Sequence, residues 1–337
     1  MTRSNVSVAV LYNESTRVIK GDRRDLIAEQ GVIACAAAIA EALEGAGYRV
    51  ARVPYRALVE DALRPYPATE WVIFNLGEGL EGRLFEEARV AWAIEAMGYR
   101  FTGNPGDAIA ISTHKGRAKR RLAAAGVSTP DWWLFRHPAE IDAVADFPFP
   151  LIVKPVAEDA SQGISGDAVA RERRALRRRV ERIVVDYRQA ALVERFIVGR
   201  EFNVALWGAP PEQLPLSEID FSAFGDAYAR YVSYAAKWEE ESFEYQHTPV
   251  TCPANVEPAL AGRLADAARR SWDAIGCRGY ARVDIRLGED GVPYVVEVNC
   301  NPDISPDAGF YRSAKRAGYS YTDMAVRILE MALKGTW

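Results

Sequence analysis

A carboxylate and an amide stand two residues apart near the end of the chain, in the stretch YVVEVNCNPD. The apolar run around Glu297 and Asn299 is typical of a strand, and residues i and i+2 of a strand point to the same face. One face would then be apolar, with Tyr294, Val296 and Val298. The other face would present an acid and an amide, which are residue types that can bind a hard metal cation.

The preceding strand, GYARVDIRL, adds charged residues to the polar face. The two strands are joined by GEDG, which predicts a tight hairpin. Pairing Leu287 with Val292 places Arg282 opposite Glu297, and directly opposed residues share a face. A slip of one residue would move one polar set to the other face. In this register the polar face contains Arg282, Asp284, Glu297 and Asn299.

Two carboxylates and an amide oxygen, without histidine or thiol, suit Mg²⁺. Magnesium keeps few protein ligands because water and phosphate oxygens fill its other positions. For this ribbon taken alone, a salt-bridge cluster on an exposed surface is an equal alternative.

Three other segments could contribute to an anion site. Lys154 lies in the apolar run PLIVKPV, where an unpaired ammonium group is costly, although a lysine in a strand is more often paired structurally. The loop EDASQGIS at 158–165 is rich in small residues and could bring backbone N–H groups close to a phosphate. Glu194 and Glu201 flank a short apolar segment in LVERFIVGREFNV.

The elements that would position these residues fall into three blocks. Residues 6–104 alternate strand and helix patterns, ending in a short strand at 99–103, which predicts a parallel sheet covered on both faces. The second block begins with a helix over 112–126, with Ser112 as its N-cap and a glycine at its end, and continues into a buried strand. The third block holds three strands and a closing helix. We therefore predict α/β domains at 1–111, 112–197 and 198–337.

Composition excludes several classes of protein. The chain has 337 residues, of which 49% are hydrophobic and 26% charged, and its net charge of -4 argues against a nucleic-acid or membrane partner. The basic run RERRALRRRVER is interpreted as a solvated helix face rather than an RNA-binding stripe. No signal-peptide pattern or membrane span is recognised, which predicts a cytoplasmic protein. The four cysteines have no metal-site spacing and are expected to be buried reduced thiols.

The order and spacing of these motifs resemble the ATP-grasp superfamily, most closely its D-alanine–D-alanine ligase branch. The resemblance covers nearly the whole chain and is strongest over 112–204 and 279–332. It implies three domains, with a parallel-sheet N-terminal domain and the nucleotide held between two α+β lobes.

The resemblance also implies a nucleotide site. Lys115 in STHKGRAKRRL and Lys154 in PLIVKP match the two lysines that hold the phosphates, and Lys237 in YAAKW matches a third phosphate-contacting lysine. Glu201 matches the acid that holds the ribose hydroxyls. The hinge that reads adenine through backbone groups corresponds to Glu194, Arg195 and Ile197. The loop 157–166, with Ser161 and Gly163, would close over the phosphates.

The same resemblance assigns the metal and the phosphoryl transfer. Asp284, Glu297 and Asn299 match the ligands of Mg²⁺, with two ions expected and Mn²⁺ as an alternative. Arg282 matches the arginine that neutralises the transferred phosphoryl group, so catalysis would depend on Arg282, Lys237 and Lys154. The implied reaction activates a substrate carboxylate with ATP as an acylphosphate, which a small amine then attacks. The family also suggests a homodimer through the first block.

The chain departs from the ligases where they bind amino acids. The glycine-rich turn after the first strand is replaced by LYNESTRVIKGDRRD, and the His-Gly motif by FNLGEGLEG. Ala160 replaces the first of two serines in the phosphate loop, Trp238 replaces a tyrosine, and Asp303 stands where a glycine is usual. Three functions stay open: a carboxylate–amine ligase for other substrates, an authentic D-alanine–D-alanine ligase, and a nucleotide-binding scaffold without ligase activity.

The acceptor region suggests a further hypothesis. Asp303 and Asp307 in NPDISPDAGF would repel a second carboxylate and attract a basic group. The acceptor would then carry a second basic group, or its carboxylate would be held elsewhere, for example by Arg312. Both aspartates could instead cap the following turn or helix.

Overall fold

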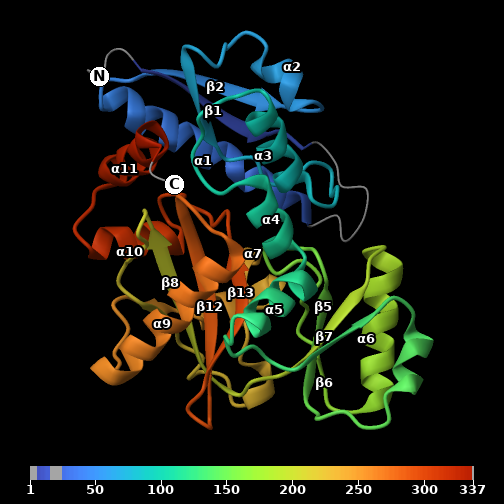
Figure 1. Ribbon diagram of the computed structural model, residues 1–337. Coiled ribbons are helices and arrows are strands. Elements are labelled where there is room, and N and C mark those ends of the chain that lie inside the picture. Colours follow the sequence, from blue (N-terminus) through green and yellow to red (C-terminus); the bar gives the residue numbers. More distant parts are fainter. Residues whose placement is uncertain (1–5, 16–24, 336–337) are drawn as a thin grey trace.

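The first block contains a three-stranded parallel sheet at the top of Figure 1, in the order β2-β1-β3. The computed structural model describes residues 6–15 and 25–335, so the segment 16–24, part of the predicted replacement for the glycine-rich turn, lies outside the described residues. The strands and helices of this block are β1 (Ser7–Asn13), α1 (Asp25–Gly45), β2 (Arg49–Tyr55), α2 (Val59–Leu63), β3 (Trp71–Asn75), α3 (Glu86–Ala96) and α4 (Gly106–Thr113).

Both faces of this sheet are covered, as its sequence pattern predicts. Val8 and Val10 of β1 pack in one core with residues of α1 and α11, whereas Ala9 and Leu11 pack in another core with α3. Successive residues of a strand point to opposite faces, so a continuous apolar run needs a cover on each side. The predicted strand at 99–103 is wrong, because only Phe101 forms a single bridge, to Ile73, before the chain turns into α4.

The second block is a four-stranded antiparallel sheet in the order β4-β7-β5-β6. Its elements are α5 (Lys115–Ala124), β4 (Trp132–Phe135), the 3₁₀ helix η2 (Pro138–Ala143), β5 (Leu151–Pro155), β6 (Val169–Ala170), α6 (Arg173–Asp186) and β7 (Ala191–Arg195). Helix α6 contains most of the basic run and buries Leu176, Val180 and Ile183 against the sheet. One arginine departs from the predicted solvated face, since Arg179 is buried against Asp167.

The helix predicted over 112–126 is two helices. Ser112 lies in the last turn of α4, where its hydroxyl donates to the Ile109 carbonyl oxygen at 3.0 Å, so it is not an N-cap. The chain breaks at His114, whose ring Nδ1 accepts a hydrogen bond from the Arg117 N–H at 3.3 Å and caps α5. This break starts α5 at Lys115.

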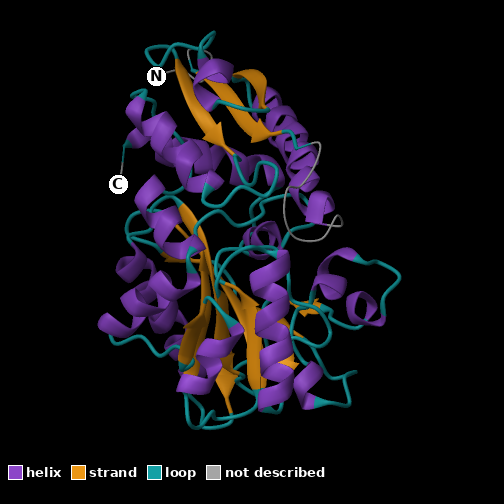
Figure 2. Cartoon of the chain, turned by 90° about the vertical axis from the view of Figure 1, so that its right-hand side faces the viewer, coloured by secondary structure: helices purple, strands orange, loops and turns teal. Residues whose placement is uncertain are grey.

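The third block is built on a sheet in the order β11-β10-β8-β12-β13, with β9 paired to β8. Its elements are β8 (Gly199–Trp207), β9 (Glu212–Gln213), β10 (Ser217–Ile219), η3 (Ala227–Ala229), α7 (Tyr234–Trp238), α8 (Phe243–Gln246), β11 (Val250–Thr251), α9 (Pro258–Ile275), β12 (Tyr280–Gly288), β13 (Pro293–Asn299), α10 (Gly309–Arg316) and α11 (Tyr321–Lys334). In Figure 2 the strands of the lower part of the molecule form a central layer with helices beside it. The three sheets lie within the three predicted segments, and the exact domain boundaries stay a prediction.

The predicted register of the β12–β13 hairpin is wrong. Leu287 pairs with Pro293 rather than with Val292, and Arg282 lies opposite Asn299 rather than opposite Glu297. The register also shifts between Asp284, which pairs with Glu297, and Ile285, which pairs with Val295. Val296 is therefore the extra residue of a bulge, which an alternating pattern does not reveal.

The bulge also changes which valines face the core. Val295 and Val298 are buried, whereas Val296 lines a cavity and Tyr294 is only partly buried. The apolar face predicted from Tyr294, Val296 and Val298 is therefore correct only at Val298.

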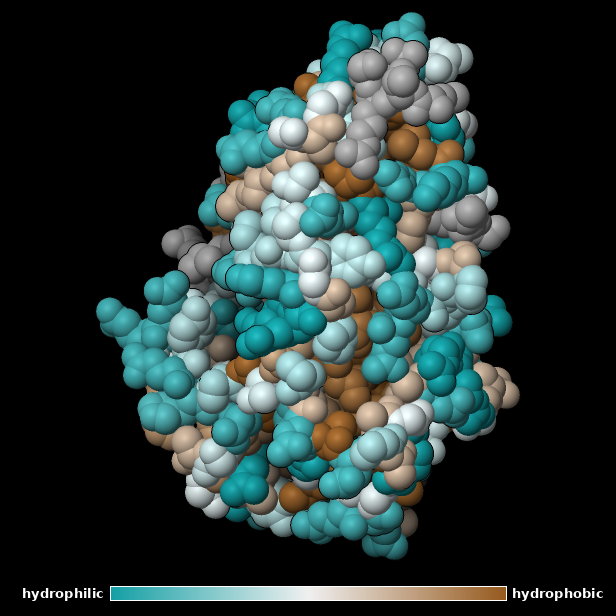
Figure 3. Space-filling view, turned by 90° about the vertical axis from the view of Figure 1, so that its left-hand side faces the viewer, coloured by the Kyte–Doolittle hydropathy of each residue, from teal (hydrophilic) through white to brown (hydrophobic). Residues whose placement is uncertain are grey.

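The surface and the cysteines add two findings. Among the described residues, no helix combines the length and the hydrophobicity that a membrane span requires. Figure 3 shows a face covered mainly by hydrophilic side chains, with smaller apolar areas. All four cysteines are free, but Cys277 is only partly buried, so the expectation of buried thiols is correct for Cys35, Cys252 and Cys300.

One glycine fixes the approach of β8 to β12. Gly199 has φ +148°, and a Cβ at this position would lie 1.9 Å from the Leu287 carbonyl oxygen. We predict that Gly199→Ala lowers the free energy of unfolding by about 2 kcal/mol or more, because the backbone must shift. Urea denaturation measures this change.

The matched control is Gly262→Ala at an exposed position of helix α9, where a Cβ meets nothing within 4 Å. This variant should gain roughly 0.5–1 kcal/mol from helix propensity. Equal stability of Gly199→Ala and wild type would show that β8 and β12 tolerate the side chain.

Candidate functional site

A cavity of about 420 Å³ lies between the second and third sheets. Its walls come from both blocks, with β5, β7 and the loop 157–166 on one side and β12, β13 and α7 on the other. All but one of the predicted site residues line it: Lys115, Lys154, Ser161, Glu194, Arg195, Ile197, Glu201, Lys237, Arg282, Asp284, Glu297 and Asn299. The exception is Gly163, which packs against Pro155, where a Cβ would lie 2.5 Å from Pro155 Cγ.

Three buried charges form an ion triad at the wall of this cavity. Glu194 of β7 is only 1% exposed, and one of its carboxylate oxygens pairs with Lys154 of β5 and the other with Lys119 of α5. Burial opposes the charged form of Glu194, yet the two ammonium groups outweigh it and hold the pKa of the carboxyl below its usual value. Burial lowers the pKa of Lys119, and the nearby charge of Lys154 adds to this effect, so that together they outweigh the attraction of Glu194.

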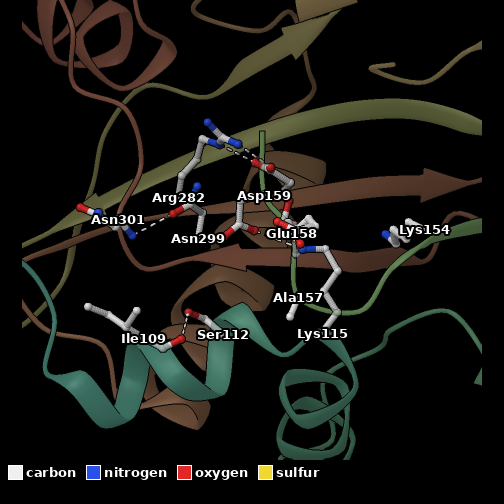
Figure 4. Close-up of polar contacts among 12 residues, drawn as sticks. Ile109, Ser112, Lys115, Lys154, Ala157, Glu158, Asp159, Arg282, Asn299 and Asn301 are labelled. Carbon is white, nitrogen blue, oxygen red and sulfur yellow. Dashed lines mark hydrogen bonds and ion pairs between the residues drawn. The ribbon is translucent and has the colours of Figure 1, made fainter. Parts of the chain in front are cut away.

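Lys115 is held by a second set of acceptors. Its Nζ lies 2.8 Å from Glu297 Oε1, 3.1 Å from Asp159 Oδ1 and 2.6 Å from the Glu158 carbonyl oxygen. Figure 4 shows Lys115 directed toward Glu158 and Asp159. Burial alone would lower the pKa of Lys115, but Asp159 and Glu297 outweigh it and raise that pKa. This lysine therefore stays charged and ties α5 to both lobes.

The polar face of the β12–β13 ribbon lines the same cavity. Arg282 donates to both oxygens of Asp284, from Nε at 2.7 Å and from Nη2 at 2.8 Å. Asn203 of β8, which pairs with Asp284 in the sheet, donates to Asp284 Oδ1 at 2.7 Å. Asn299 accepts from the Asn301 N–H through its Oδ1 at 2.8 Å. The shifted register leaves all four predicted side chains on this face, since Asp284 lies directly opposite Glu297.

The side-chain oxygens of Asp284, Glu297 and Asn299 fit a magnesium ion whose other ligands are mainly water and phosphate. In the described parts of the chain, no group of three or more histidine, cysteine, aspartate or glutamate side chains forms a metal cluster. The possible metal ligands are two carboxylates and one amide oxygen. In the structure each carboxylate pairs with a cation of the protein, Glu297 with Lys115 and Asp284 with Arg282. A hard cation with few protein ligands suits this chemistry.

The hinge and Glu201 are positioned by a buried arginine. Arg286 donates from Nε to the Ile197 carbonyl oxygen at 2.7 Å and from Nη1 to Glu201 Oε2 at 2.7 Å. The backbone N–H groups of Arg195 and Phe196 donate to the carbonyl oxygens of Asp131 and Pro150, which immediately precede β4 and β5. Within residues 6–15 and 25–335, the Ile197 N–H has no such partner, which leaves one free donor at the cavity wall.

The loop 157–166 is fastened to the segment that carries Lys237. Ser161 donates to the Val232 carbonyl oxygen at 3.0 Å, and Trp238 Nε1 donates to the Ala160 carbonyl oxygen at 2.9 Å. Ala160 and Ser161 both have positive φ, a conformation that costs energy for residues with a side chain. Burial lowers the pKa of Lys237, and Arg282 adds to this effect.

The aspartates near the acceptor region line the cavity but differ in role. Asp303 accepts from the Ser305 N–H at 2.8 Å and from its hydroxyl at 2.5 Å, so it does cap a turn. Asp307 is not a helix cap, because the N-cap of α10 is Ala308. Arg312 also lines the cavity and donates to the Asp307 carbonyl oxygen.

Sequence reasoning missed three side chains of this site: Lys119, Asn203 and Arg286. The sequence spacing could have indicated Lys119, because it follows Lys115 by four residues and therefore lies on the same face of the helix. Arg286 likewise follows Asp284 by two residues on the cavity face of β12. Nothing in the sequence indicates Asn203, whose role depends on the pairing of β8 with β12.

Comparisons with known proteins agree with this architecture. The family profile described as "D-ala D-ala ligase C-terminus" matches residues 122–330. The uncharacterized protein y4sG of Sinorhizobium fredii is 35% identical over 80% of this chain and 76% of its own length. The D-alanine–D-alanine ligase of Nitrosomonas europaea is 33% identical over 75% of this chain and 78% of its own length.

Solved structures share the fold. The D-alanine–D-alanine ligase of Bacillus anthracis, in complex with ATP, superposes with a TM-score of 0.73 at 21% identity and covers 98% of both chains. The VanG D-Ala:D-Ser ligase of Enterococcus faecalis gives a TM-score of 0.71 at 20% identity, covering 97% of this chain and 99% of that one.

The Lys115–Glu297 pair predicts a pH dependence of stability. Burial opposes the charged form of Glu297, but Lys115 and Lys154 lower its pKa from 4.5 to about 2. The folded-state pKa lies below the unfolded one, so this stabilisation is complete above about pH 4.5 and is lost as the pH falls toward 2. Wild type should exceed Glu297→Gln in unfolding free energy by roughly 2–3 kcal/mol at pH 7, and by progressively less below pH 4.5.

Urea denaturation of both proteins between pH 7 and pH 3 measures this difference. Glu44→Gln, on an exposed position of α1, is the control and should follow wild type throughout. A difference between wild type and Glu297→Gln that does not change with pH would contradict the ion-pair assignment.

Proposed function

Because the chain belongs to the D-alanine–D-alanine ligase family, whose ATP-grasp fold it shares, we propose that it is an ATP-dependent ligase that joins a small carboxylate to a small amine. Its substrates differ from a pair of D-alanines. The observation that carries the proposal is the convergence of Lys115, Lys154 and Lys237 on one cavity with the acids of β12 and β13. A nucleotide-binding scaffold would not require the two metal-type carboxylates.

The lysines would hold the phosphates of ATP. Lys154 and Lys119 share one carboxylate, so the triad carries net positive charge that incoming phosphate oxygens would neutralise. The free Ile197 N–H supports an adenine contact at the hinge, and Glu201 at the same wall would accept from the ribose hydroxyls. Ser161 and the loop 157–166 would cover the phosphates and exclude water.

The reaction follows from what these groups can do. A carboxylate oxygen of the substrate attacks the γ-phosphorus, ADP leaves, and an acylphosphate forms. The amine then attacks the acyl carbon, loses a proton and displaces inorganic phosphate. Arg282, Lys154 and Lys237 would neutralise the charge on the transferred phosphoryl group, so the protein acts through positioning and electrostatics.

Asp284, Glu297 and Asn299 would hold Mg²⁺. When bound, the ion would supply positive charge that offsets the negative charge of the phosphates, with Mn²⁺ as a substitute. To bind it, Glu297 and Asp284 would weaken their present pairs with Lys115 and Arg282, whose charges the phosphates can take over. The homodimer and the cytoplasmic location stay predictions from the sequence.

The test is a screen for ADP release over amino acids, other small carboxylates and amines, followed by mass spectrometry of the product. Lys154→Ala should raise KM for ATP and lower kcat together, because its charge acts on both the ground state and the transition state. Arg178→Ala, which removes an exposed charge from α6, is the matched control. Equal losses in the two variants would mean that the nucleotide binds elsewhere.

The acceptor side of the cavity predicts a substrate preference. Asp303 and Asp307 line the cavity and favour a basic group over a second carboxylate. Wild type should couple acceptors with an additional basic group at least about tenfold better than D-alanine, which corresponds to ~1.4 kcal/mol. Asp303→Gly should lower the ratio of kcat/KM for basic acceptors to kcat/KM for D-alanine. Efficient coupling of two D-alanines by wild type would identify an authentic D-alanine–D-alanine ligase instead.

A further inference from the structure

Lys119 is a buried lysine for which the proposed reaction has no use. It lies on α5, is only 1% exposed, and pairs with one carboxylate oxygen of Glu194, while Lys154 pairs with the other. Lys154 and Glu194 both line the main cavity, but Lys119 is not among the described residues that line it. A phosphate group in the cavity can therefore contact Lys154, whereas Lys119 lies out of its reach.

A second contact holds Lys119 in place without any part played by Lys154. Its Nζ donates to Thr129 Oγ1 at 2.8 Å, and the Thr129 hydroxyl donates in turn to the Val295 carbonyl oxygen of β13 at 2.8 Å. The Val295 N–H donates to the Ser128 carbonyl oxygen at 2.8 Å, so both backbone groups of Val295 are bound to the segment before β4. These bonds can persist when Lys154 changes its partner.

Charge balance gives the two lysines different roles toward Glu194. A carboxylate with almost no exposure needs a counter-charge at all times, because an unpaired buried ion is costly. If Lys154 were its only cation, Glu194 would compete with phosphate oxygens for that ammonium group. With Lys119 present, Lys154 can leave while Glu194 stays paired.

The departure of Lys154 would also strengthen the pair that remains. The charge of Lys154 disfavours the charged form of Lys119 and, after burial, contributes to lowering the pKa of Lys119. When the Lys154 ammonium group turns to a phosphate, this repulsion is reduced. Lys119 then becomes a better counter-ion for Glu194.

We propose that Lys119 is a positioning residue of the nucleotide site, which retains the Glu194 carboxylate and thereby releases Lys154 to the phosphates of ATP. The inference rests on the proposed use of ATP and adds a residue that touches neither nucleotide nor substrate. Because Lys119 acts through Lys154, it affects the phosphates and leaves binding of the nucleoside unchanged. Lys119 is also dispensable once Glu194 carries no charge.

The experiment compares two probes that differ in their phosphates, a non-hydrolysable ATP analogue and adenosine, both in the presence of Mg²⁺. Calorimetry measures Kd for the analogue, and displacement of a fluorescent ATP derivative measures Kd for adenosine, so no turnover is required. The variants are Lys119→Met and the double variant Lys119→Met/Glu194→Gln. The matched control is Arg121→Met, which removes an exposed cation from the same helix.

Lys119→Met should weaken binding of the ATP analogue by about tenfold or more, as expected when a charge-assisted contact with phosphate is lost, and should leave adenosine binding unchanged. The double variant should recover the affinity for the analogue to within about threefold of wild type, because residues of one charge network are not additive. Arg121→Met should bind both probes as wild type does.

A purely structural role of Lys119 makes the opposite prediction. It would weaken binding of both probes together, and Glu194→Gln would not relieve the loss. Wild-type affinity of Lys119→Met for the analogue, an equal loss for both probes, or a double variant no better than the single one would overturn the inference.

A crystal structure of wild type with the ATP analogue tests the same inference without any variant, and so decides it even where Lys119→Met does not fold. Lys154 Nζ bound to phosphate oxygens, with Lys119 still paired with Glu194, would support the inference. Lys154 still paired with Glu194 in the complex, or Lys119 itself bound to a phosphate, would refute it.

Failure of the proposed ligase function gives a different result. If the analogue binds wild type but no pair of carboxylate and amine causes ADP release, the ligase function is refuted and the binding data still decide the role of Lys119. If wild type binds no ATP analogue, both proposals are wrong.

Discussion

Charge inside a protein must be paired, and this constraint organises the main cavity. Glu194 lies between Lys119 and Lys154 with almost no exposure to solvent, so none of the three side chains could remain charged without the others. Removing one partner from such a set leaves an uncompensated buried charge, which is strongly destabilising. The triad therefore fixes where α5, β5 and β7 can lie relative to one another.

The same constraint extends across the cavity to the third block. Lys115 begins α5 and pairs both with Asp159 of the loop 157–166 and with Glu297 of β13. Arg282 and Asp284 of β12 satisfy each other, and Asn203 of β8 completes the set. Charges from several elements are thus held within reach of one another before any ligand binds. Such preorganisation is what electrostatic catalysis of phosphoryl transfer requires.

Net charge explains why this arrangement can accept a nucleotide. The triad has two cations for one anion, and the ribbon carboxylates are held by cations that phosphate oxygens could equally satisfy. When a nucleotide binds, these charged side chains would exchange their present partners for phosphate oxygens, and no charge would be left unpaired. Such an exchange costs less free energy than leaving a buried ion without a partner. A buried ion pair contributes little net stability, so positioning is the better explanation for these residues.

The sequence by itself determined the elements and the chemistry of the main cavity. The alternation of strand and helix patterns indicated a covered parallel sheet. The polar alternation at Asp284, Glu297 and Asn299 indicated one acidic face, and Lys154 in an apolar strand indicated a paired charge. These features are local, because helix and strand periods are properties of neighbouring residues.

Only the tertiary structure decided what depends on contacts between distant segments. The bulge at Val296 shifts the register of the β12–β13 hairpin, and no alternating sequence pattern encodes it. The pairing of Glu194 with Lys119 and the role of Asn203 arise between elements far apart in the chain. The sequence shows which charged residues are present, but only the fold determines which of them pair and which remain without a partner.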